Sequence, residues 1–324
     1  MLDVEEVGRK EIYRESLFIN QPYVMAALTT SVKYTFHFFC TTVVRAMSTS
    51  AMLNPKDEMK EIVLKYLDGK DNGIVVLGLN RPRVCNALGK TLTSQLHDAI
   101  SSIREDSKLR VLIIRSLVPK VFCAGADLRE RARMDNAEVS KFVSFLRNMT
   151  NNIETLPTPV ISAIDGDALG GGLEIALATD IRVAASEAKM GLVETKWAII
   201  PGAGGTQRLP RIIGSAKAKE LIYTARILNG EEAMKIGLVN EVVSQNKNGD
   251  AAYQAALSIA REILPNGPIG VKMAKTAISQ GLQVPVTDGF EIEKQCYNKV
   301  VNTKDRIEGL AAFASKRIPI YQGV

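Results

Sequence analysis

Two glutamates stand in stretches of sequence that are otherwise apolar. Glu174 lies in Leu-Glu-Ile-Ala-Leu-Ala, three residues after Gly171, and Glu194 follows twenty residues later in a second apolar context. A carboxylate in such surroundings is expected to be partly buried, which raises its pKa. Two of them could act as a general acid and a general base around one water molecule. Spacing alone leaves open the alternative of two unrelated ions, on a helix or in a loop.

The run Gly170-Gly171-Gly172 stands where a predicted strand gives way to a predicted helix. Glycine lets a ligand approach the backbone closely, and the first turn of a helix offers unpaired N–H groups with positive partial charge. The run could therefore bind a phosphate or hold a developing oxyanion. It is not a Walker A or Rossmann motif, because no Gly-Lys-Ser/Thr follows and the glycine spacing differs. A tight strand-to-helix crossing is the competing explanation.

The composition limits histidine and cysteine chemistry. His37 and His97 are the only histidines, so a three-histidine metal site is excluded and a Ser-His-Asp triad is hard to build. The four cysteines form no CxxC pair and no zinc-type spacing, which indicates free thiols in a reducing compartment. Cys123 is interpreted as a small apolar filler. The net charge of +6 favours anionic partners in general, including phosphates, CoA-like molecules and RNA.

The elements that must position these residues follow from the hydrophobic pattern. Two β-branched runs, 61–67 and 73–79, are separated by turn residues and predict a hairpin. Apolar residues within 88–103 recur at intervals of three and four, as in an amphipathic helix. The other predicted strands are 111–116, 160–165 and 181–185, and the other predicted helices are 137–156, 169–178, 215–225, 231–237, 250–263, 268–280, 288–300 and 303–315. This order suggests a stacked spiral of strand-strand-helix units, followed by a helical region.

The N-terminal segment differs from the rest of the chain. No Asp or Glu occurs from Ser16 to Lys56, and Ser and Thr are frequent there, as in a mitochondrial transit peptide. The acidic first fifteen residues do not fit this pattern, but a start at Met25 gives a plausible presequence with a cleavage region near Arg45. The alternative is a disordered extension. No apolar run is long enough for a membrane span. The predicted division is a targeting or disordered segment at 1–56, a core at 57–250 and a C-terminal helical region at 251–324.

Three motifs then occur in a characteristic order: FCAGADL, ALGGGLE, and GLVE followed by IIPGAGGTQRLP. Together they resemble the crotonase family, that is, the enoyl-CoA hydratases and isomerases. The resemblance extends from about Glu61 to the C-terminal RIEGLAAFASKRIPIY. The longer segments FCAGADLRERARM and IRVAASEAKMGLVETKWAIIP most resemble the mitochondrial methylglutaconyl-CoA hydratase branch, which is also described as binding AU-rich RNA.

The resemblance implies an α/β fold, a crotonase-like spiral of repeated β-β-α units with a C-terminal helical trimerisation region. It assigns the oxyanion hole to the backbone N–H groups of Ala124 and Gly171. Glu174 and Glu194 become the two catalytic carboxylates, and the N–H of Gly202 would help to position the water. The presence of both acids favours hydration over isomerase chemistry. No metal and no cofactor is implied, because CoA is part of the substrate.

The resemblance also implies where CoA binds and how subunits assemble. The predicted substrate-binding residues are Arg83, Ala124, Gly125, Ala126, Asp127 and Lys316. We expect trimers that pair into hexamers, in which the C-terminal helix brings Phe313 and Lys316 to the CoA of a neighbouring subunit. Asp167 departs from the family pattern, since relatives carry an apolar or aromatic residue there. This acid could tune the pocket or face solvent.

The acyl group and a second function remain open at this stage. The expected substrate is 3-methylglutaconyl-CoA of leucine degradation, and the alternative is a short-chain enoyl-CoA of fatty-acid β-oxidation. A distal carboxylate would need a cation in the pocket, for which Arg131 and Lys196 are candidates. Trp197 is expected in the core. RNA binding is the competing class, but segment 86–110 carries a net charge of only +1 and no aromatic residue for base stacking.

Overall fold

A computed structural model describes residues 60–324, so the predicted targeting segment lies outside the described residues. Six strands form a large sheet in the order β1-β2-β3-β5-β7-β9. β1 (Ile62–Tyr66) and β2 (Ile74–Leu79) form the predicted antiparallel hairpin, with Leu64 opposite Leu77. The remaining neighbours in this sheet are parallel, and these strands are β3 (Val111–Ser116), β5 (Val160–Ile164), β7 (Ile181–Ala185) and β9 (Glu241–Val243).

A second, smaller sheet consists of three short parallel strands. These are β4 (Val121–Cys123), β6 (Asp167–Leu169) and β8 (Met190–Gly191), paired in the order β4-β6-β8. β4, β6 and β8 directly follow β3, β5 and β7 of the large sheet along the chain. The chain thus places one strand in each sheet per turn, which confirms the predicted spiral. Strands of two or three residues carry too little pattern to be predicted, so this sheet was not expected as such.

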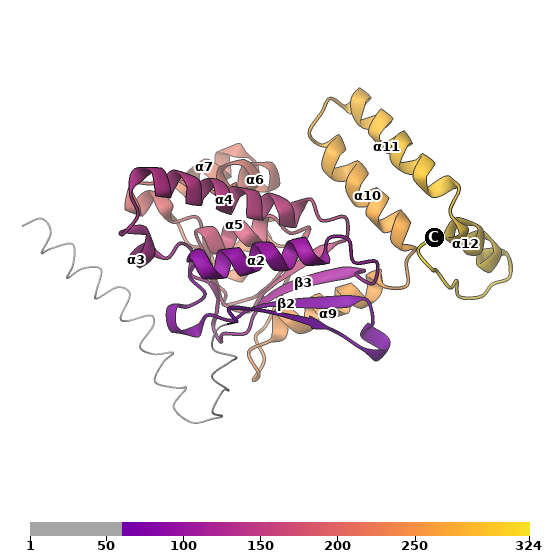
Figure 1. Cartoon of the computed structure of the whole chain (residues 1–324), viewed down its shortest axis with the longest axis horizontal. Helices are drawn as coiled ribbons and strands as arrows, with labels where there is room; N and C mark the ends of the chain where they lie inside the picture. The colour runs from indigo at the N-terminus through magenta and orange to yellow at the C-terminus, as the bar shows by residue number, and fades with distance from the viewer. Residues whose placement is uncertain (1–59) are drawn as a thin grey trace, which may run out of the picture. The chain divides into compact units, whose positions relative to one another are not determined.

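The central strands of the large sheet are buried on both faces. Along β3, Leu112 and Ile114 join the core shared with α2 (Lys90–Ile103) and α4 (Asn136–Glu154). Val111 and Ile113 point to the opposite core, which is closed by α9 (Ala251–Ile263). This alternation is the period of two that a strand imposes on its side chains. Figure 1 shows α2 and α4 on one side of β2 and β3, with α9 on the other.

The shorter helices connect these layers. They are the α-helices α3 (Leu128–Arg131), α5 (Gly171–Leu177), α6 (Gly205–Ile213), α7 (Ser215–Thr224) and α8 (Gly230–Lys235), and the 3-10 helices η1 (Gly69–Asp71), η2 (Pro82–Val84) and η3 (Glu194–Trp197). α6 was not predicted. Its sequence begins with Gly-Thr-Gln and contains Pro210, so its pattern indicates a loop.

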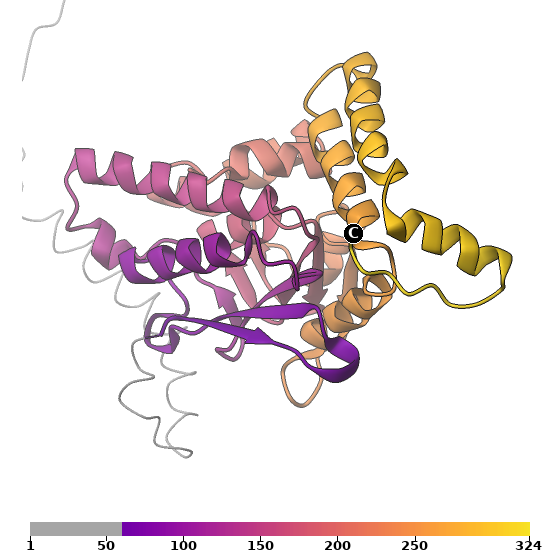
Figure 2. The same ribbon diagram turned by 45° about the vertical axis from the view of Figure 1, so that its right-hand side comes forward.

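The C-terminal region contains α10 (Pro268–Gly281), α11 (Val286–Val301) and α12 (Lys304–Ala314). α10 and α11 pack against each other, and Figure 2 shows them, in orange to yellow, extending away from the sheets. Lys275 of α10 donates to Asp180 Oδ2 and to the carbonyl of Thr158, and these bonds connect the pair of helices α10 and α11 to the core. α9, in contrast, packs on the large sheet, so it shares the core although it lies within the predicted region 251–324. No helix among the described residues has the length and apolar character needed to cross a membrane.

Candidate active site

Glu174 is a buried carboxylate on α5. The helix begins after Gly170, whose φ of 51° is a left-handed conformation suited to glycine. The Glu174 residue is only 3% exposed, and its Oε1 accepts hydrogen bonds from the N–H groups of Ala203 (2.8 Å) and Gly205 (2.7 Å). Both bonds go to the same oxygen, so Oε2 remains for a ligand or a water molecule. The glycine-rich segment before α6 therefore fixes the orientation of this carboxylate.

Opposing effects act on the pKa of Glu174. Burial raises it, while the N–H groups of Gly205 and Ala203, and more weakly the positive charges of Arg208 and Arg147, lower it. The net result is a pKa above the ordinary value. The backbone donors stabilise the ionised form, because a carboxylate that accepts N–H bonds is favoured over the neutral acid.

Glu194 lies beside the start of the same helix. It opens η3, and a Cβ placed on Gly170 would lie 3.2 Å from Glu194 Oε1. Burial, and then the negative charge of Glu174, raise the pKa of Glu194 to about 7. Its Oε2 is buried and has no hydrogen-bond partner among the described residues. The fold thus brings the two predicted carboxylates together and gives them different environments.

Two backbone N–H groups near the start of α5 are left without an acceptor. Gly171 is the first residue of α5, so its N–H has no acceptor within the helix. In the loop after β4, the N–H of Ala124 donates to Cys85 O (3.1 Å) and that of Asp127 donates to Leu88 O (3.2 Å). The Ala126 N–H between them has no acceptor within residues 60–324. The expected donor Ala124 is therefore engaged inside the protein, and the geometry offers Ala126 in its place.

Glycines allow this loop to lie against the start of α5. A Cβ on Gly125 would lie 2.7 Å from Leu169 O and 3.4 Å from Gly171 N, and Gly125 has a φ of 91°. A Cβ on Gly172 would overlap Cys123 O. The tight crossing considered for the glycine run is thus real, and it is also what brings the two N–H donors together.

The segment before α2 supports this loop from the other side. Arg81 bonds Glu61, Asp127 and Glu130, and the buried Asn86 donates from Nδ2 to Phe122 O (3.0 Å). The Asp127 carboxylate also caps α3 through the N–H groups of Arg129 and Glu130. The carboxylate of Asp127, which was predicted to contact the substrate, is therefore bound to groups of the protein itself. Arg83 is exposed on η2 in the same segment.

Arg131 is the cation that the fold turns inward. Its Nη1 is buried without a hydrogen-bond partner in the described part of the chain, and its guanidinium lies over Phe142 at 5.2 Å. Burial lowers its pKa, and the charge of Glu174 raises it. Lys196, the other candidate, is exposed. Trp197 was expected in the core, but the prediction is wrong: the residue is 46% exposed on the short η3, where no layer covers it.

The remaining predicted residues have separate environments. The Gly202 carbonyl accepts from Arg147 Nε at 3.2 Å, next to the donors that hold Glu174. Asp167 lies on β6, accepts from the Lys189 N–H (3.3 Å), and has a pKa raised mainly by burial. Cys123 is buried and donates to Asn86 O, and burial raises its pKa to about 12, as suits a small apolar filler.

Phe313 and Lys316 are exposed at the end of α12, which Figures 1 and 2 place away from α3.

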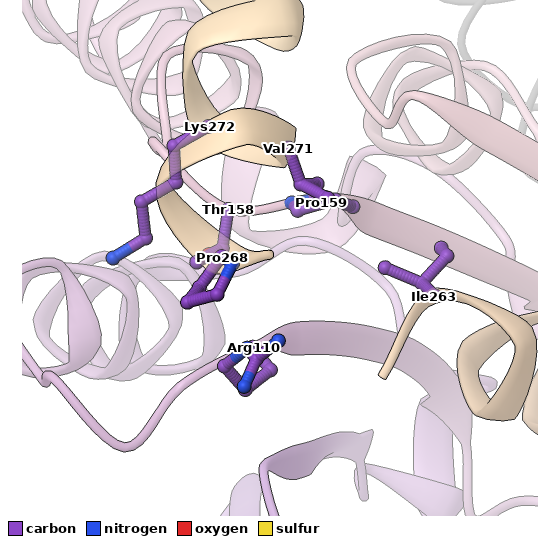
Figure 3. A pocket seen from close by; sticks show the side chains of 7 residues that line it. All are labelled: Arg110, Thr158, Pro159, Ile263, Pro268, Val271 and Lys272. Carbon is purple, nitrogen blue, oxygen red and sulfur yellow. The ribbon is translucent and has the colours of Figure 1, made fainter. Parts of the chain in front are cut away.

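Other candidate sites receive less support. Of the bases considered for RNA, Lys90 lies near Glu138, Arg104 donates to the Asn152 and Thr155 carbonyls, and Arg110 donates to Leu264 O. A small crevice between β3, α9 and α10 contains none of the predicted site residues (Figure 3); it is lined by Arg110, Thr158, Pro159, Ile263, Pro268, Val271 and Lys272. Within the described residues, no group of three or more His, Cys, Asp or Glu side chains is arranged to hold a metal ion.

A two-sheet spiral with paired carboxylates beside free N–H groups defines a protein of the crotonase type. Residues 69–323 match the model of the enoyl-CoA hydratase/isomerase family, and the chain belongs to this family. A mitochondrial methylglutaconyl-CoA hydratase of Mus musculus is 56% identical over 274 residues, which cover 85% of this chain and 86% of the relative.

Two further relatives agree with this family assignment. The human mitochondrial enoyl-CoA hydratase domain-containing protein 2 is 54% identical over 263 residues, covering 81% of this chain and 90% of the relative. The crystal structure of an enoyl-CoA hydratase from Bacillus anthracis has a TM-score of 0.78 and 48% identity, and covers 82% of this chain and all of that one. The predicted family and fold are confirmed.

The environment of Glu194 predicts a pH-dependent effect on stability. Its pKa rises from 4.5 to about 7 on folding, so the folded state binds the proton more tightly. The contribution of protonated Glu194 to the free energy of unfolding is fully present below pH 4.5, and it is lost as the pH rises through 7. We expect the free energy of unfolding of Glu194→Gln, relative to that of the wild type, to increase by on the order of 2 kcal/mol from pH 5 to pH 8. Urea unfolding at both pH values, with the exposed Glu187→Gln as control, measures this. A difference that does not change with pH would contradict it.

Proposed function

We propose that the chain adds water across the double bond of a 2-enoyl-CoA thioester, and that 3-methylglutaconyl-CoA is its substrate. The observation that carries the hydratase proposal is the pair formed by the buried Glu174 and the half-buried Glu194 beside the free N–H groups of Ala126 and Gly171. The family membership and the mouse relative, named a methylglutaconyl-CoA hydratase, support the proposal.

The oxyanion site is proposed first, because charge develops there. Attack of water on Cβ of the enoyl group moves electrons to the thioester carbonyl oxygen. The N–H groups of Ala126 and Gly171 would donate to this oxygen. Such preorganised donors are typically worth about 3–4 kcal/mol each, because they need no reorganisation as the charge forms. The position of Gly171 at the first turn of α5 adds the positive end of a helix dipole.

The two carboxylates would move the protons. Glu174, oriented by two N–H donors, accepts a proton from water as the hydroxyl adds to Cβ. Glu194, with a pKa of about 7, delivers its proton to Cα. The product is the 3-hydroxyacyl-CoA, and transfer of a proton from Glu174 to Glu194 through water restores the starting state. Because the acids interact, their titration belongs to the pair. No cofactor takes part in this proposal, since CoA enters with the substrate.

The substrate's distal carboxylate would be matched by Arg131. A buried guanidinium nitrogen without a hydrogen-bond partner, such as Nη1 of Arg131, is costly unless a ligand supplies the missing partner. The negative charge of Glu174 also raises the pKa of Arg131, which supports a position of this cation near the two glutamates. A short-chain enoyl-CoA lacks the carboxylate and is the alternative substrate.

CoA binding and assembly are proposed together. The CoA path is assigned to Arg83 and the 124–127 loop, with Lys316 and Phe313 contributed by α12 of a second copy of this chain. The exposure of large apolar side chains along the C-terminal helices supports an assembly of trimers into hexamers; these include Leu282, Val286, Phe290, Leu310 and Phe313. We also propose the mitochondrial matrix as the location, in agreement with the mitochondrial relatives.

Removing the acid–base capacity of either glutamate should abolish most turnover. Glu174→Gln and Glu194→Gln keep the size of the side chain, and each positioned acid or base typically contributes about 10²–10⁴-fold. We expect a loss of that order in kcat for each variant with crotonyl-CoA, and a much smaller change in KM. The double variant should lose far less than the product of the two losses, because the pair acts on one water. Near wild-type hydration by either single variant would reject the mechanism.

Arg131→Met should separate the two substrates. Loss of a buried cation that pairs with a carboxylate costs about 2 kcal/mol or more, so kcat/KM for 3-methylglutaconyl-CoA should fall at least about 30-fold. Crotonyl-CoA, without that carboxylate, should be affected much less. Arg133→Met, an exposed arginine two residues along, is the matched control. Lys196→Met tests the other candidate. Equal losses on both substrates for Arg131→Met would reject this role.

Deletion of residues 303–324 should weaken assembly and activity together. The deletion removes α12 with Phe313 and Lys316, and Phe313 is 86% exposed in the single chain. Analytical ultracentrifugation and a crotonyl-CoA assay measure the two effects. Phe313→Ala, in the full chain, should raise KM with the fold intact. A fully active monomer after deletion would contradict the model.

A further inference from the structure

Arg208 forms a dense set of hydrogen bonds behind Glu174. It lies on α6 and is 8% exposed. Its Nε and Nη2 donate to Glu154 Oε2 (3.0 and 2.7 Å), and Nη2 also donates to Asn151 Oδ1 (2.6 Å). Its Nη1 donates to Thr150 Oγ1 (3.2 Å) and to the carbonyl of Ala203 (3.0 Å). All three nitrogens are thus engaged, and three of the acceptors lie on α4.

The Ala203 contact links this set to the carboxylate. The Ala203 carbonyl accepts from Arg208 and also from Thr150 Oγ1 at 2.7 Å. The N–H of the same residue, together with that of Gly205, holds Glu174 Oε1. Both sides of Ala203 are therefore fixed: one by Arg208 and Thr150, the other by Glu174.

Gly204 shows that the loop is shaped around the guanidinium. Its φ of 106° is left-handed, and a Cβ at this position would overlap Arg208 Nη1. The loop therefore lies directly on Arg208. Loss of the arginine would leave the Ala203 carbonyl with one donor and the loop without its support, so the two N–H groups would no longer be aimed at one oxygen.

The helix α4 supplies the frame on which Arg208 rests. Thr150 and Asn151 lie three and four residues after Arg147, and Glu154 lies three and four residues after them, so all four lie on one face of the helix. Arg147 contacts the carbonyl of Gly202, and the others contact Arg208. One face of α4 thus holds the loop 202–205 at two points.

We propose that Arg208 is a positioning residue for the general base: by fixing the loop 202–205 it keeps Oε1 of Glu174 occupied and presents Oε2 to the attacking water. The inference rests on the proposed function. The charged groups around Glu174 are Arg208 on α6, Arg147 on α4, Arg131 on α3 and Glu194 on η3. Arg208 acts with Arg147 and Arg131 to favour the ionised base, and Glu194 acts against it when charged.

Arg208→Met tests the proposal by its pH profile. We expect kcat for crotonyl-CoA to fall about 10²-fold at neutral pH, as for a misplaced catalytic group, with KM changed less than about threefold. The acidic limb of kcat/KM should move to higher pH, because loss of a positive charge and of aligned N–H donors raises the pKa of the base. Arg208→Lys, which keeps the charge but not the fork, should recover the position of the limb more than it recovers kcat.

Arg182→Met is the matched control. Arg182 is 7% exposed and donates to the carbonyls of Leu238 (2.8 Å) and Thr179 (2.7 Å), so it is a buried, carbonyl-binding arginine outside this network. Its replacement should lower thermal stability without moving the acidic limb. Thr150→Val removes the second donor to Ala203 and should shift the limb in the same direction by less. It carries the test if Arg208→Met does not fold.

The outcomes separate the two proposals. The positioning role would be overturned if Arg208→Met showed an unshifted acidic limb and a kcat near that of the wild type. If Arg208→Met does not fold, the same result in both Thr150→Val and Arg208→Lys would overturn it. A shift equal to that of Arg182→Met would do the same. If the wild-type chain itself fails to hydrate both crotonyl-CoA and 3-methylglutaconyl-CoA, the proposed function fails instead. If the wild-type chain hydrates a substrate, and the acidic limb shifts in the variants of Arg208 and Thr150 but not in Arg182→Met, both the proposed function and the positioning role are supported.

Discussion

The hydrogen bonds from Ala203 and Gly205 to Glu174 are the contacts on which the site depends. A carboxylate that is 3% exposed is costly to bury unless donors replace its water. Here both donors come from backbone that is itself fixed by Arg208 and α4. The orientation of the acid is therefore decided by segments that follow it by about thirty residues in the chain.

The spiral explains how these segments meet. Each turn contributes a short strand to the small sheet. The 124–127 loop, Gly171 and Glu194 follow β4, β6 and β8, so they lie at one edge of this sheet. Parallel strands place their carboxyl ends on the same side, which is where ligands bind in many α/β proteins. Within this arrangement Glu174 has two donors, whereas Glu194 has an unpartnered oxygen and a pKa near 7. One architecture thus gives two glutamates different environments, as the proposed base and acid require.

Much of this protein could be predicted from its sequence. The predicted ranges 111–116 and 181–185 coincide with β3 and β7, because β-branched runs between turn residues have few alternatives. The two glutamates stood out because a charge in an apolar helix or strand segment needs a reason. The family motifs added the fold, since the order of three glycine-containing segments is more specific than any one of them.

Tertiary structure decided the rest. The sequence could not show that the N–H of Ala124 donates to Cys85 O while the N–H of Ala126 has no acceptor within residues 60–324, because every residue except proline carries the same backbone donor. Nor could it show that Arg131, the candidate named from the sequence, packs over Phe142, whereas Arg129 and Arg133 are exposed. The short strands of the second sheet and the hydrogen bonds of Arg208 join segments far apart in the chain, which a local pattern does not reveal. Local pattern thus determined the elements and the acids, and long-range packing determined which polar groups remain free to act.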